Sequence, residues 1–268
     1  MTHIDGKHIL LTGGSRGIGP VIAEALARRG AHIALAARSQ EGLSHVAESL
    51  SEFDVQTMTV AVDLAQPDQR HRLVSTVLEK FGAIDILVNN AGLENEGAYL
   101  SLPWQRIQET IEVNLLAPME LTYLLLPHML ERKMGHIVNM ASVAAKCGAP
   151  YAATYDATKA GLAEWAQGLR LELADTGVHF STILPGYITE VGMFARFGLT
   201  PPRTAASCTP TQVANAVIKA IEHNTLEVIV SSTPQRLFYA LKELSPALGD
   251  RIMYKSGAVD FQRKKVGL

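Results

Sequence analysis

Short apolar runs alternate with amphipathic stretches along most of the chain. The runs are rich in Ile, Leu, Val and Ala, which is typical of the strands of a parallel sheet. Between them, apolar residues recur at intervals of three and four, which predicts helices. The alternation predicts an α/β protein with a doubly wound parallel sheet of about seven strands and helices on both faces. We expect strands at residues 7–12, 31–37, 56–62, 84–89, 135–140, 178–184 and 226–231, and helices at 17–29, 40–51, 67–81, 104–131, 153–175, 210–223 and 234–246.

Neither a repeat nor a low-complexity linker divides this pattern. The 268 residues, 47% of them hydrophobic, are enough to build one large core. We therefore expect a single domain over residues 1–268. Within it, residues 232–268 form a C-terminal helical extension and tail. The tail contains three consecutive basic residues, Arg263, Lys264 and Lys265, and we expect it to be solvated and mobile.

Charge and composition argue against several classes of protein. The net charge of −2 gives no electrostatic case for binding nucleic acid. No apolar run is long enough for a transmembrane segment, and the first residues do not form a signal peptide. Two cysteines, Cys147 and Cys208, are too few for a disulfide framework, so we expect a cytoplasmic protein. The nine histidines are scattered without metal-ligand spacing, and no metal site is expected.

A glycine-rich turn joins the first predicted strand to the first predicted helix, with the sequence Thr-Gly-Gly-Ser-Arg-Gly-Ile-Gly over residues 12–19. Strand, glycine turn and helix in this order hold a dinucleotide pyrophosphate in a Rossmann fold. The glycines let the backbone approach the phosphates, and the helix N-terminus offers free N–H groups. The spacing is GxxxGxG and not the general GxGxxG fingerprint. A glycine turn without a ligand is the alternative.

Tyr155 and Lys159 stand four residues apart in a predicted helix, thirteen residues after Ser142. Positions i and i+4 share a helix face, so the Lys159 ammonium can lie beside the Tyr155 phenol. A nearby cation favours the phenolate and would lower the pKa of Tyr155, which suits an acid–base group. An ordinary surface Tyr–Lys pair is the alternative.

Together these residues resemble the short-chain dehydrogenase/reductase family, in its single-domain type with a Tyr-xxx-Lys motif and here with a C-terminal extension. The resemblance runs from about residue 5 to about residue 230, and its motifs follow in the family's order and spacing. They are TGxxxGxG (Thr12, Gly13, Gly17, Gly19), NNAG (Asn89, Asn90, Ala91, Gly92), the asparagine of the fourth helix (Asn114), the Ser/Tyr/Lys set (Ser142, Tyr155, Lys159) and the PG turn (Pro185, Gly186) with Thr189 after it.

The resemblance implies hydride transfer between a nicotinamide cofactor and a carbonyl compound, a ketone or an aldehyde, with its alcohol as the other partner. Tyr155 would be the acid in reduction and the base in oxidation. Ser142 would hydrogen-bond the substrate oxygen. Lys159 would lower the pKa of Tyr155 and bind the nicotinamide ribose, and Asn114 would hold a water of the proton relay.

The end of the second predicted strand bears on the choice of cofactor. An NAD site places a carboxylate there, whereas an arginine accommodates the 2′-phosphate of NADP. This chain has Arg38 at that point, and Arg16 stands in the glycine turn. We therefore expect NADP(H) to be favoured over NAD(H). The expected cofactor-binding residues are Gly13, Ser15, Arg16, Gly17, Ile18, Gly19, Arg38, Ser39, Asp63, Leu64, Asn90, Ala91, Gly92, Tyr155, Lys159, Pro185, Gly186, Ile188 and Thr189.

The substrate is the least determined feature. Residues 191–199, where the family has a substrate lid, are rich in Met and Phe, which favours a lipophilic carbonyl compound. A lid helix that packs on the body explains the same residues. Tyr151 is expected to line the substrate pocket. The C-terminal extension is similar to that of members acting on steroids, retinoids, lipids or xenobiotic ketones, and differs from the ending of 3-oxoacyl-[acyl-carrier-protein] reductases.

Three alternatives stay open. The first is a 3-oxoacyl-[acyl-carrier-protein] reductase-like enzyme. The second is a non-catalytic NADP-sensing binding protein on the same fold. The third is a peripheral membrane reductase with helix 234–246 on lipid, although this segment carries only the cations Arg236 and Lys242.

Association is expected from two long helices, 104–131 and 153–175, which are apolar on more than one face. One face covers the sheet, and the other needs a partner. The family pairs its subunits through these helices, so the resemblance implies a homodimer or homotetramer.

Overall fold

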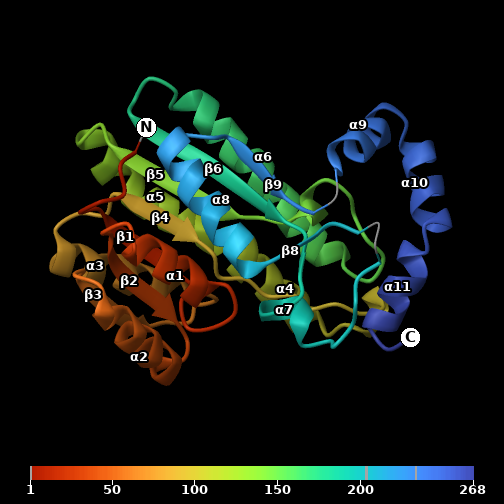
Figure 1. Ribbon diagram of the computed structural model, residues 1–268, viewed down its shortest axis with the longest axis horizontal. Coiled ribbons are helices and arrows are strands. Elements are labelled where there is room, and N and C mark those ends of the chain that lie inside the picture. The colour runs from red at the N-terminus through yellow and green to blue at the C-terminus, as the bar shows by residue number, and fades with distance from the viewer. Residues whose placement is uncertain (1, 203–204, 233) are drawn as a thin grey trace.

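The central feature is a parallel sheet. The computed structural model describes residues 2–202, 205–232 and 234–268. In these residues seven parallel strands form one sheet in the order β3-β2-β1-β4-β5-β6-β9 (Figure 1). This confirms the predicted doubly wound sheet. The strands are β1 His8–Thr12, β2 His32–Ala37, β3 Thr57–Ala61, β4 Ile86–Asn89, β5 Gly135–Met140, β6 Val178–Pro185 and β9 Glu227–Val230.

The two faces of the sheet carry separate apolar cores. Successive residues of a strand point to opposite faces, so Ile9 and Leu11 of β1 join one core and Leu10 joins the other. Both cores exclude water almost completely, which explains why the strands read as continuous apolar runs. The first core is covered by α1 (Gly19–Ala27), α2 (Gln40–Ser49) and α8 (Pro210–His223), and the second by α3 (Pro67–Phe81), α5 (Ala117–Glu131) and α6 (Ala153–Glu172).

The chain reverses its direction of winding between β1 and β4. Strands β2 and β3 lie on one side of β1, and all later strands lie on the other. Loops at the carboxyl ends of β1 and β4 therefore separate and leave a crevice, which is where open α/β sheets bind ligands.

The predicted helix 104–131 is interrupted. The chain forms α4 (Trp104–Ile111), then a wide π-helical turn over Glu112–Leu116, and then α5. The interruption has a local cause, because Pro118 has no N–H to donate to the Asn114 carbonyl four residues earlier. Wide turns of this kind often lie at functional sites.

The C-terminal segment differs from the prediction. In place of one helix and a mobile tail, it forms α9 (Arg236–Leu244), α10 (Pro246–Lys255) and α11 (Ala258–Lys265). We call residues 234–268 the C-terminal cap. Figure 1 shows the cap beside the sheet at its right-hand end, with α11 near the short helix α7 (Gly192–Ala195). A small parallel pair, β7 (Tyr187–Ile188) and β8 (Ser207–Cys208), lies before the cap.

None of the helices in the described ranges is long and apolar enough to cross a membrane.

Candidate active site

The glycine turn has a shape that only glycine permits. Gly13 and Gly17 have φ values of 68° and 66°, in the left-handed region. A Cβ on Gly13 would lie 2.8 Å from the Ala91 Cα, and one on Gly19 would lie 2.1 Å from the Gly13 carbonyl oxygen. The turn therefore presents bare backbone at the N-terminus of α1, which suits a pyrophosphate.

Asn90 connects this turn to the end of β4. Its Nδ2 donates to the carbonyl oxygens of Thr12 (2.9 Å) and Gly13 (3.1 Å). The Thr12 hydroxyl accepts from the main-chain N–H groups of Asn90 (3.0 Å) and Ala91 (3.1 Å). Among the residues that the structure describes, the buried Asn90 Oδ1 has no hydrogen-bond partner. An acceptor left open beside the glycine turn fits a dinucleotide bound in the crevice.

The two predicted phosphate-binding arginines lie on the same side of the crevice and are exposed. A Cβ on Gly42 of α2 would lie 3.1 Å from the Ser15 Cβ, so the glycine turn touches the start of α2. Arg38 precedes α2, and its side chain is 53% exposed. Its Nη1 lies 3.8 Å from Glu109 Oε1 of α4, an acidic neighbour that the sequence position did not indicate. Arg16 is also exposed.

Three further predicted cofactor residues have structural roles of their own. Ser39 caps α2, because its hydroxyl accepts from the Gly42 N–H at 3.1 Å. Asp63 Oδ1 accepts from the Ala65 N–H at 3.0 Å, and Leu64 is buried in the core.

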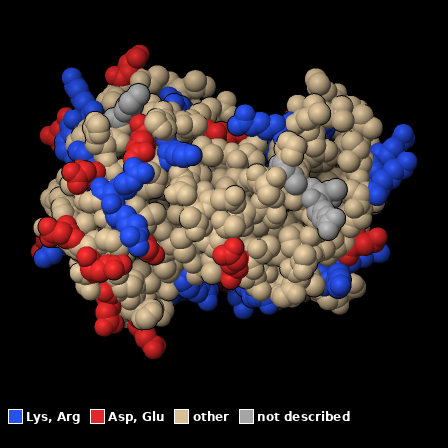
Figure 2. All heavy atoms as spheres, viewed as in Figure 1, with Lys and Arg blue, Asp and Glu red and all other residues tan. Residues whose placement is uncertain are grey.

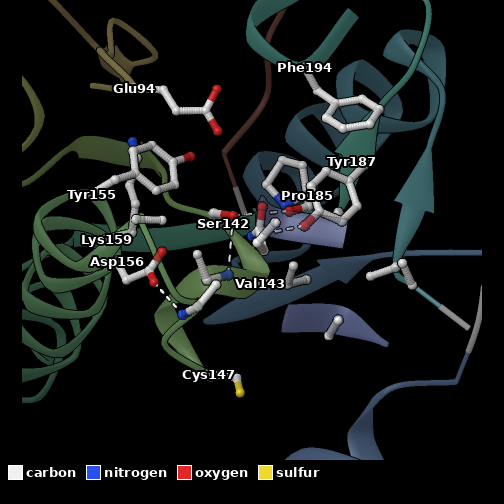
Figure 3. Close-up of a pocket in the computed structure, with 18 of the residues that line it drawn as sticks. Glu94, Ser142, Val143, Cys147, Tyr155, Asp156, Lys159, Pro185, Tyr187 and Phe194 are labelled. Atoms are coloured by element: carbon white, nitrogen blue, oxygen red, sulfur yellow. Dashed lines mark hydrogen bonds between the residues drawn. The ribbon is translucent and has the colours of Figure 1, made fainter. Parts of the chain in front are cut away.

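Ser142, Tyr155 and Lys159 meet at the carboxyl ends of β5 and β6 (Figure 3). Ser142 follows β5, and its Oγ lies 3.5 Å from the Pro185 carbonyl oxygen and accepts from the Ala144 N–H. Tyr155 lies in the first turn of α6. One turn later, the Lys159 Nζ lies 5.7 Å from the centre of the Tyr155 ring and donates to the Met140 carbonyl at 2.7 Å.

The direction of the Tyr155 pKa corrects the sequence prediction. Without a bound cofactor, burial raises the pKa of Tyr155, and the negative charge of Glu94 raises it further. The neighbouring Ser142 hydroxyl acts in the opposite direction. Lys159 is itself desolvated, which lowers its pKa to about 8. The spacing of the motif indicated the Lys159 cation, but it did not show that Tyr155 is buried or that Glu94 lies near it. Tyr155 is therefore protonated at neutral pH, as a proton donor must be.

Asn114 lies in the π-helical turn and is fully buried. Its Oδ1 accepts from the Leu93 N–H at 2.7 Å, and its Nδ2 donates to the Leu93 carbonyl and the Thr158 hydroxyl at 2.8 and 3.2 Å. The side chain thus ties the π-helical turn, α6 and the segment after β4 together. Gly92 lies beside both Asn114 and Lys159, because a Cβ placed there would lie 3.5 Å from the Asn114 Oδ1 and 3.6 Å from the Lys159 Nζ.

A cavity of about 460 Å³ opens above these residues. Its wall is largely apolar, and the cap supplies one side of it, including Phe238, Ile252, Met253 and Phe261. Of the predicted site residues, it is lined by Ile18, Asn90, Ser142, Tyr155, Lys159, Pro185, Gly186 and Ile188.

Several site residues differ from prediction or were missed. Thr189 is exposed. Tyr151 is not in the lining of this cavity, and its hydroxyl instead accepts from the Arg263 Nε at 3.0 Å. Glu94, Glu96 and Lys265 line the cavity without having been singled out. The two glutamates follow the NNAG motif closely, which was a usable signal.

Comparison with known proteins identifies the family. The model of the short chain dehydrogenase family matches residues 7–200, and the chain belongs to this family. The ketoacyl reductase HetN of Nostoc sp. is 42% identical over 99% of this chain and 94% of its own length. A dehydrogenase/reductase SDR family protein 7-like of Anopheles gambiae is 32% identical over 94% of this chain and 84% of its own length.

Two solved structures extend the likeness to the fold. An actinorhodin polyketide ketoreductase with NADPH has a TM-score of 0.78 and 30% identity, over 86% of this chain and 98% of that one. A short-chain dehydrogenase from Sphingobium yanoikuyae in complex with NADPH has a TM-score of 0.79 and 28% identity, over 91% of this chain and 95% of that one.

Proposed function

We propose that this protein is an NADP(H)-dependent oxidoreductase that interconverts a lipophilic carbonyl compound and its alcohol. The observation that carries the proposal is the convergence of Ser142, Tyr155 and Lys159 at the polar end of an otherwise apolar cavity. The same cavity adjoins the glycine turn through Ile18 and Asn90. Residues 1–268 act as one domain in this proposal.

The crevice at the carboxyl ends of β1 and β4 would hold the cofactor. The glycine turn fits the pyrophosphate, and Arg16 and Arg38 are exposed where a 2′-phosphate would bind. The bound nicotinamide supplies or accepts the hydride. Structure neighbours that are complexed with NADPH support the NADP(H) preference.

Proton transfer falls to Tyr155. Its hydroxyl is protonated at neutral pH and would donate to the carbonyl oxygen as negative charge develops there, although burial and the charge of Glu94 raise its pKa and so oppose the transfer. The Ser142 hydroxyl donates a hydrogen bond to the same oxygen. Lys159, one helical turn from Tyr155, is where the nicotinamide ribose would bind. Asn114 holds the segment after β4 in place and would support a water of the relay.

A second candidate is the reduction of a 3-oxoacyl thioester. The observation in its favour is that HetN is named a ketoacyl reductase and that an actinorhodin polyketide ketoreductase shares the fold at 30% identity. A non-catalytic NADP-sensing protein is disfavoured because Asn114, Ser142, Tyr155 and Lys159 are all present.

Association through the two long helices remains part of the proposal. Tyr123 of α5 is 77% exposed and Leu171 of α6 is 72% exposed, which suits an interface between copies of the chain in a homodimer or homotetramer. Light scattering at micromolar concentration tests this, and a monomer mass would contradict it. A cytoplasmic location is proposed on composition alone.

The function is tested by an activity screen. A panel of apolar ketones, aldehydes and 3-oxoacyl thioesters is offered with NADPH and with NADH, and oxidation of the cofactor is followed. We expect turnover with NADPH on apolar carbonyls. If NADPH binds but the panel gives no turnover, the NADP-sensing alternative replaces this proposal.

A further inference from the structure

The last helix of the chain ends in a buried charge. Lys265 of α11 has a side chain that is 1% exposed, and its Nζ lies 2.8 Å from Glu94 Oε1 and 2.8 Å from Glu96 Oε2. Figure 2 shows other basic side chains of this region on the outer edge of the molecule. An ammonium buried in this way needs strong partners, and the two carboxylates supply them.

Aromatic rings complete the surroundings of Lys265. Its Nζ lies 5.7 Å from the ring centre of Tyr187, 5.8 Å from that of Phe194 and 5.1 Å from that of Phe197. These rings belong to the segment after β6, where a substrate lid is expected. A cation over desolvated aromatic faces is further stabilised. Lys265 therefore joins the segment after β4, the segment after β6 and the cap.

Neighbouring residues of α11 also contact the body. The Gln262 Nε2 donates to the Tyr187 hydroxyl at 3.3 Å, and the Arg263 Nε donates to the Tyr151 hydroxyl at 3.0 Å. Among Gln262, Arg263 and Lys265, the residue that is both buried and paired with a carboxylate is Lys265. Its partner Glu94 lies on the cavity wall. The docked position of α11 thus combines these two buried carboxylate contacts with the packing of Phe261 on the rings of Tyr187 and Phe194.

The carboxylates in turn face the reacting groups. Glu94 and Glu96 line the cavity that contains Tyr155, and Figure 3 shows the Glu94 and Tyr155 side chains directed into the same space. The charge of Glu94 reaches Tyr155, because it raises the pKa of that phenol. Burial raises the pKa of Glu96 to about 7, Glu94 adds to this rise, and Lys265 opposes it.

We propose that Lys265 is a positioning residue of the reaction: it holds the Glu94–Glu96 pair at the cavity wall and keeps the C-terminal cap closed over the substrate. This inference rests on the proposed function for its kinetic consequence. Its structural consequence, closure of the cap, is independent of that function. Lys265 lies outside residues 7–200, the part of the chain that the family model matches.

Other charged groups face this cluster. The Arg196 Nη2 lies 3.9 Å from Glu94 Oε2 and is therefore a second cation beside this carboxylate. Asp156 is buried, which raises its pKa to about 7, and Lys265 opposes this rise. The charge of Glu94 also acts to raise the pKa of Lys159 and that of Tyr187. A test must therefore separate Lys265 from its neighbours by matched variants.

The decisive variant is Lys265→Met, which keeps the length of the side chain but removes its charge. Lys264→Met is the matched control, because Lys264 is the preceding residue of α11 and is exposed. We expect KM for the carbonyl substrate to rise by about tenfold or more in Lys265→Met, the scale of a lost charged hydrogen bond. We expect kcat to change less than KM, and Lys265→Arg to restore most of the affinity.

Amide hydrogen exchange supplies the second readout, without substrate. Exchange in residues 234–268 should become faster in Lys265→Met and stay unchanged in Lys264→Met. Unchanged cap exchange in Lys265→Met would overturn the proposal, and so would an unchanged KM in an active enzyme. If the wild type reduces no carbonyl, the proposed function fails, and the exchange comparison alone decides the role of Lys265.

Discussion

The cofactor side and the cap side of this site are built in different ways. On the cofactor side, residues 12–19 form one turn between a strand and a helix, and the contacts of Asn90 with this turn join the ends of two neighbouring strands. On the cap side, Lys265 reaches residues that are 171 and 169 positions away in the chain. The first arrangement follows from local geometry and from the sheet, and the second exists only once the chain has folded.

This difference has a functional meaning. The cofactor side presents backbone groups whose positions are fixed by two apolar cores. The cap side is held by contacts between side chains of α11 and the body, such as those of Lys265. In the proposal above, the cofactor side binds the cofactor in one fixed way, and opening of the cap admits the substrate.

The largest expected effect lies where the two sides meet. We expect Tyr155→Phe to lower kcat for carbonyl reduction by about 10²–10⁴-fold, because the hydroxyl that donates the proton is lost. NADPH binding, followed by fluorescence titration, should stay close to that of the wild type. Tyr151→Phe is the matched control, since Tyr151 contacts Arg263 and not the cavity. Retention of more than a tenth of wild-type kcat in Tyr155→Phe would show that another group donates the proton.

The next largest effect belongs to the cofactor side. If Arg38 binds the 2′-phosphate, Arg38→Asp should reduce the preference for NADPH over NADH by about 10- to 150-fold, the scale of one hydrogen bond to a charged group. The preference is measured as the ratio of kcat/KM for the two cofactors. Arg72→Asp makes the same charge change at an exposed position of α3 and should leave this ratio unaltered. An unchanged ratio in Arg38→Asp would mean that, in the wild type, Arg38 remains paired with Glu109 and does not bind the 2′-phosphate.

A smaller effect is expected on the cap side, as a dependence on pH. Glu96 has a pKa of about 7 when buried and 4.5 as its ordinary value, so between these values the closed cap binds a proton that an open one does not. Closure is therefore strongest near and below pH 4.5, becomes weaker as the pH rises from 4.5 to about 7, and levels off above 7. We expect KM for the substrate to rise between pH 4.5 and about 7 in the wild type, to level off above 7, and to lose this dependence in Glu96→Gln.

Asp156 requires a separate control, since its pKa is also raised to about 7. If Glu96 is responsible, Asp156→Asn keeps the rise of KM between pH 4.5 and about 7. If the dependence disappears in Asp156→Asn and survives in Glu96→Gln, the account of the cap is wrong.

The smallest effect concerns the exposed pair of Arg38 and Glu109. Exposed ion pairs contribute at most about 1 kcal/mol, so Glu109→Gln should tighten NADPH binding by no more than about fivefold. The thermal unfolding midpoint should be unchanged. Weaker NADPH binding in Glu109→Gln would contradict the view that Glu109 competes for Arg38.

The sequence predicted the sheet well because its central strands are buried on both faces and are therefore largely apolar, as in β1 and β2. It also predicted the approach of Lys159 to Tyr155, because helix geometry alone brings positions i and i+4 together. The break in the helix after Ile111 could be anticipated from Pro118, which has no N–H group to donate. To recognise it, one must identify the Asn114 carbonyl, four residues earlier, as the acceptor that Pro118 leaves without a donor. The pKa of Tyr155 depends on burial and on Glu94, which spacing does not show.

The predicted helix 234–246 corresponds to α9, but the docking of α11 was beyond prediction for a physical reason. A basic stretch at a chain end is normally solvated, because charges are costly to bury. Lys265 is an exception only because Glu94 and Glu96 meet it from a distant segment. A local pattern does not contain that information.

The central claim is hydride transfer to a carbonyl with Tyr155 as proton donor. Its most direct test is a product analysis with NADPH carrying deuterium at the transferable position of the nicotinamide, using the best apolar carbonyl of the panel and detecting the alcohol by mass spectrometry. The account predicts an alcohol with one deuterium on the carbinol carbon from the wild type and little or none from Tyr155→Phe at equal cofactor occupancy. An alcohol without deuterium, or equal deuterated product from both proteins, would contradict it.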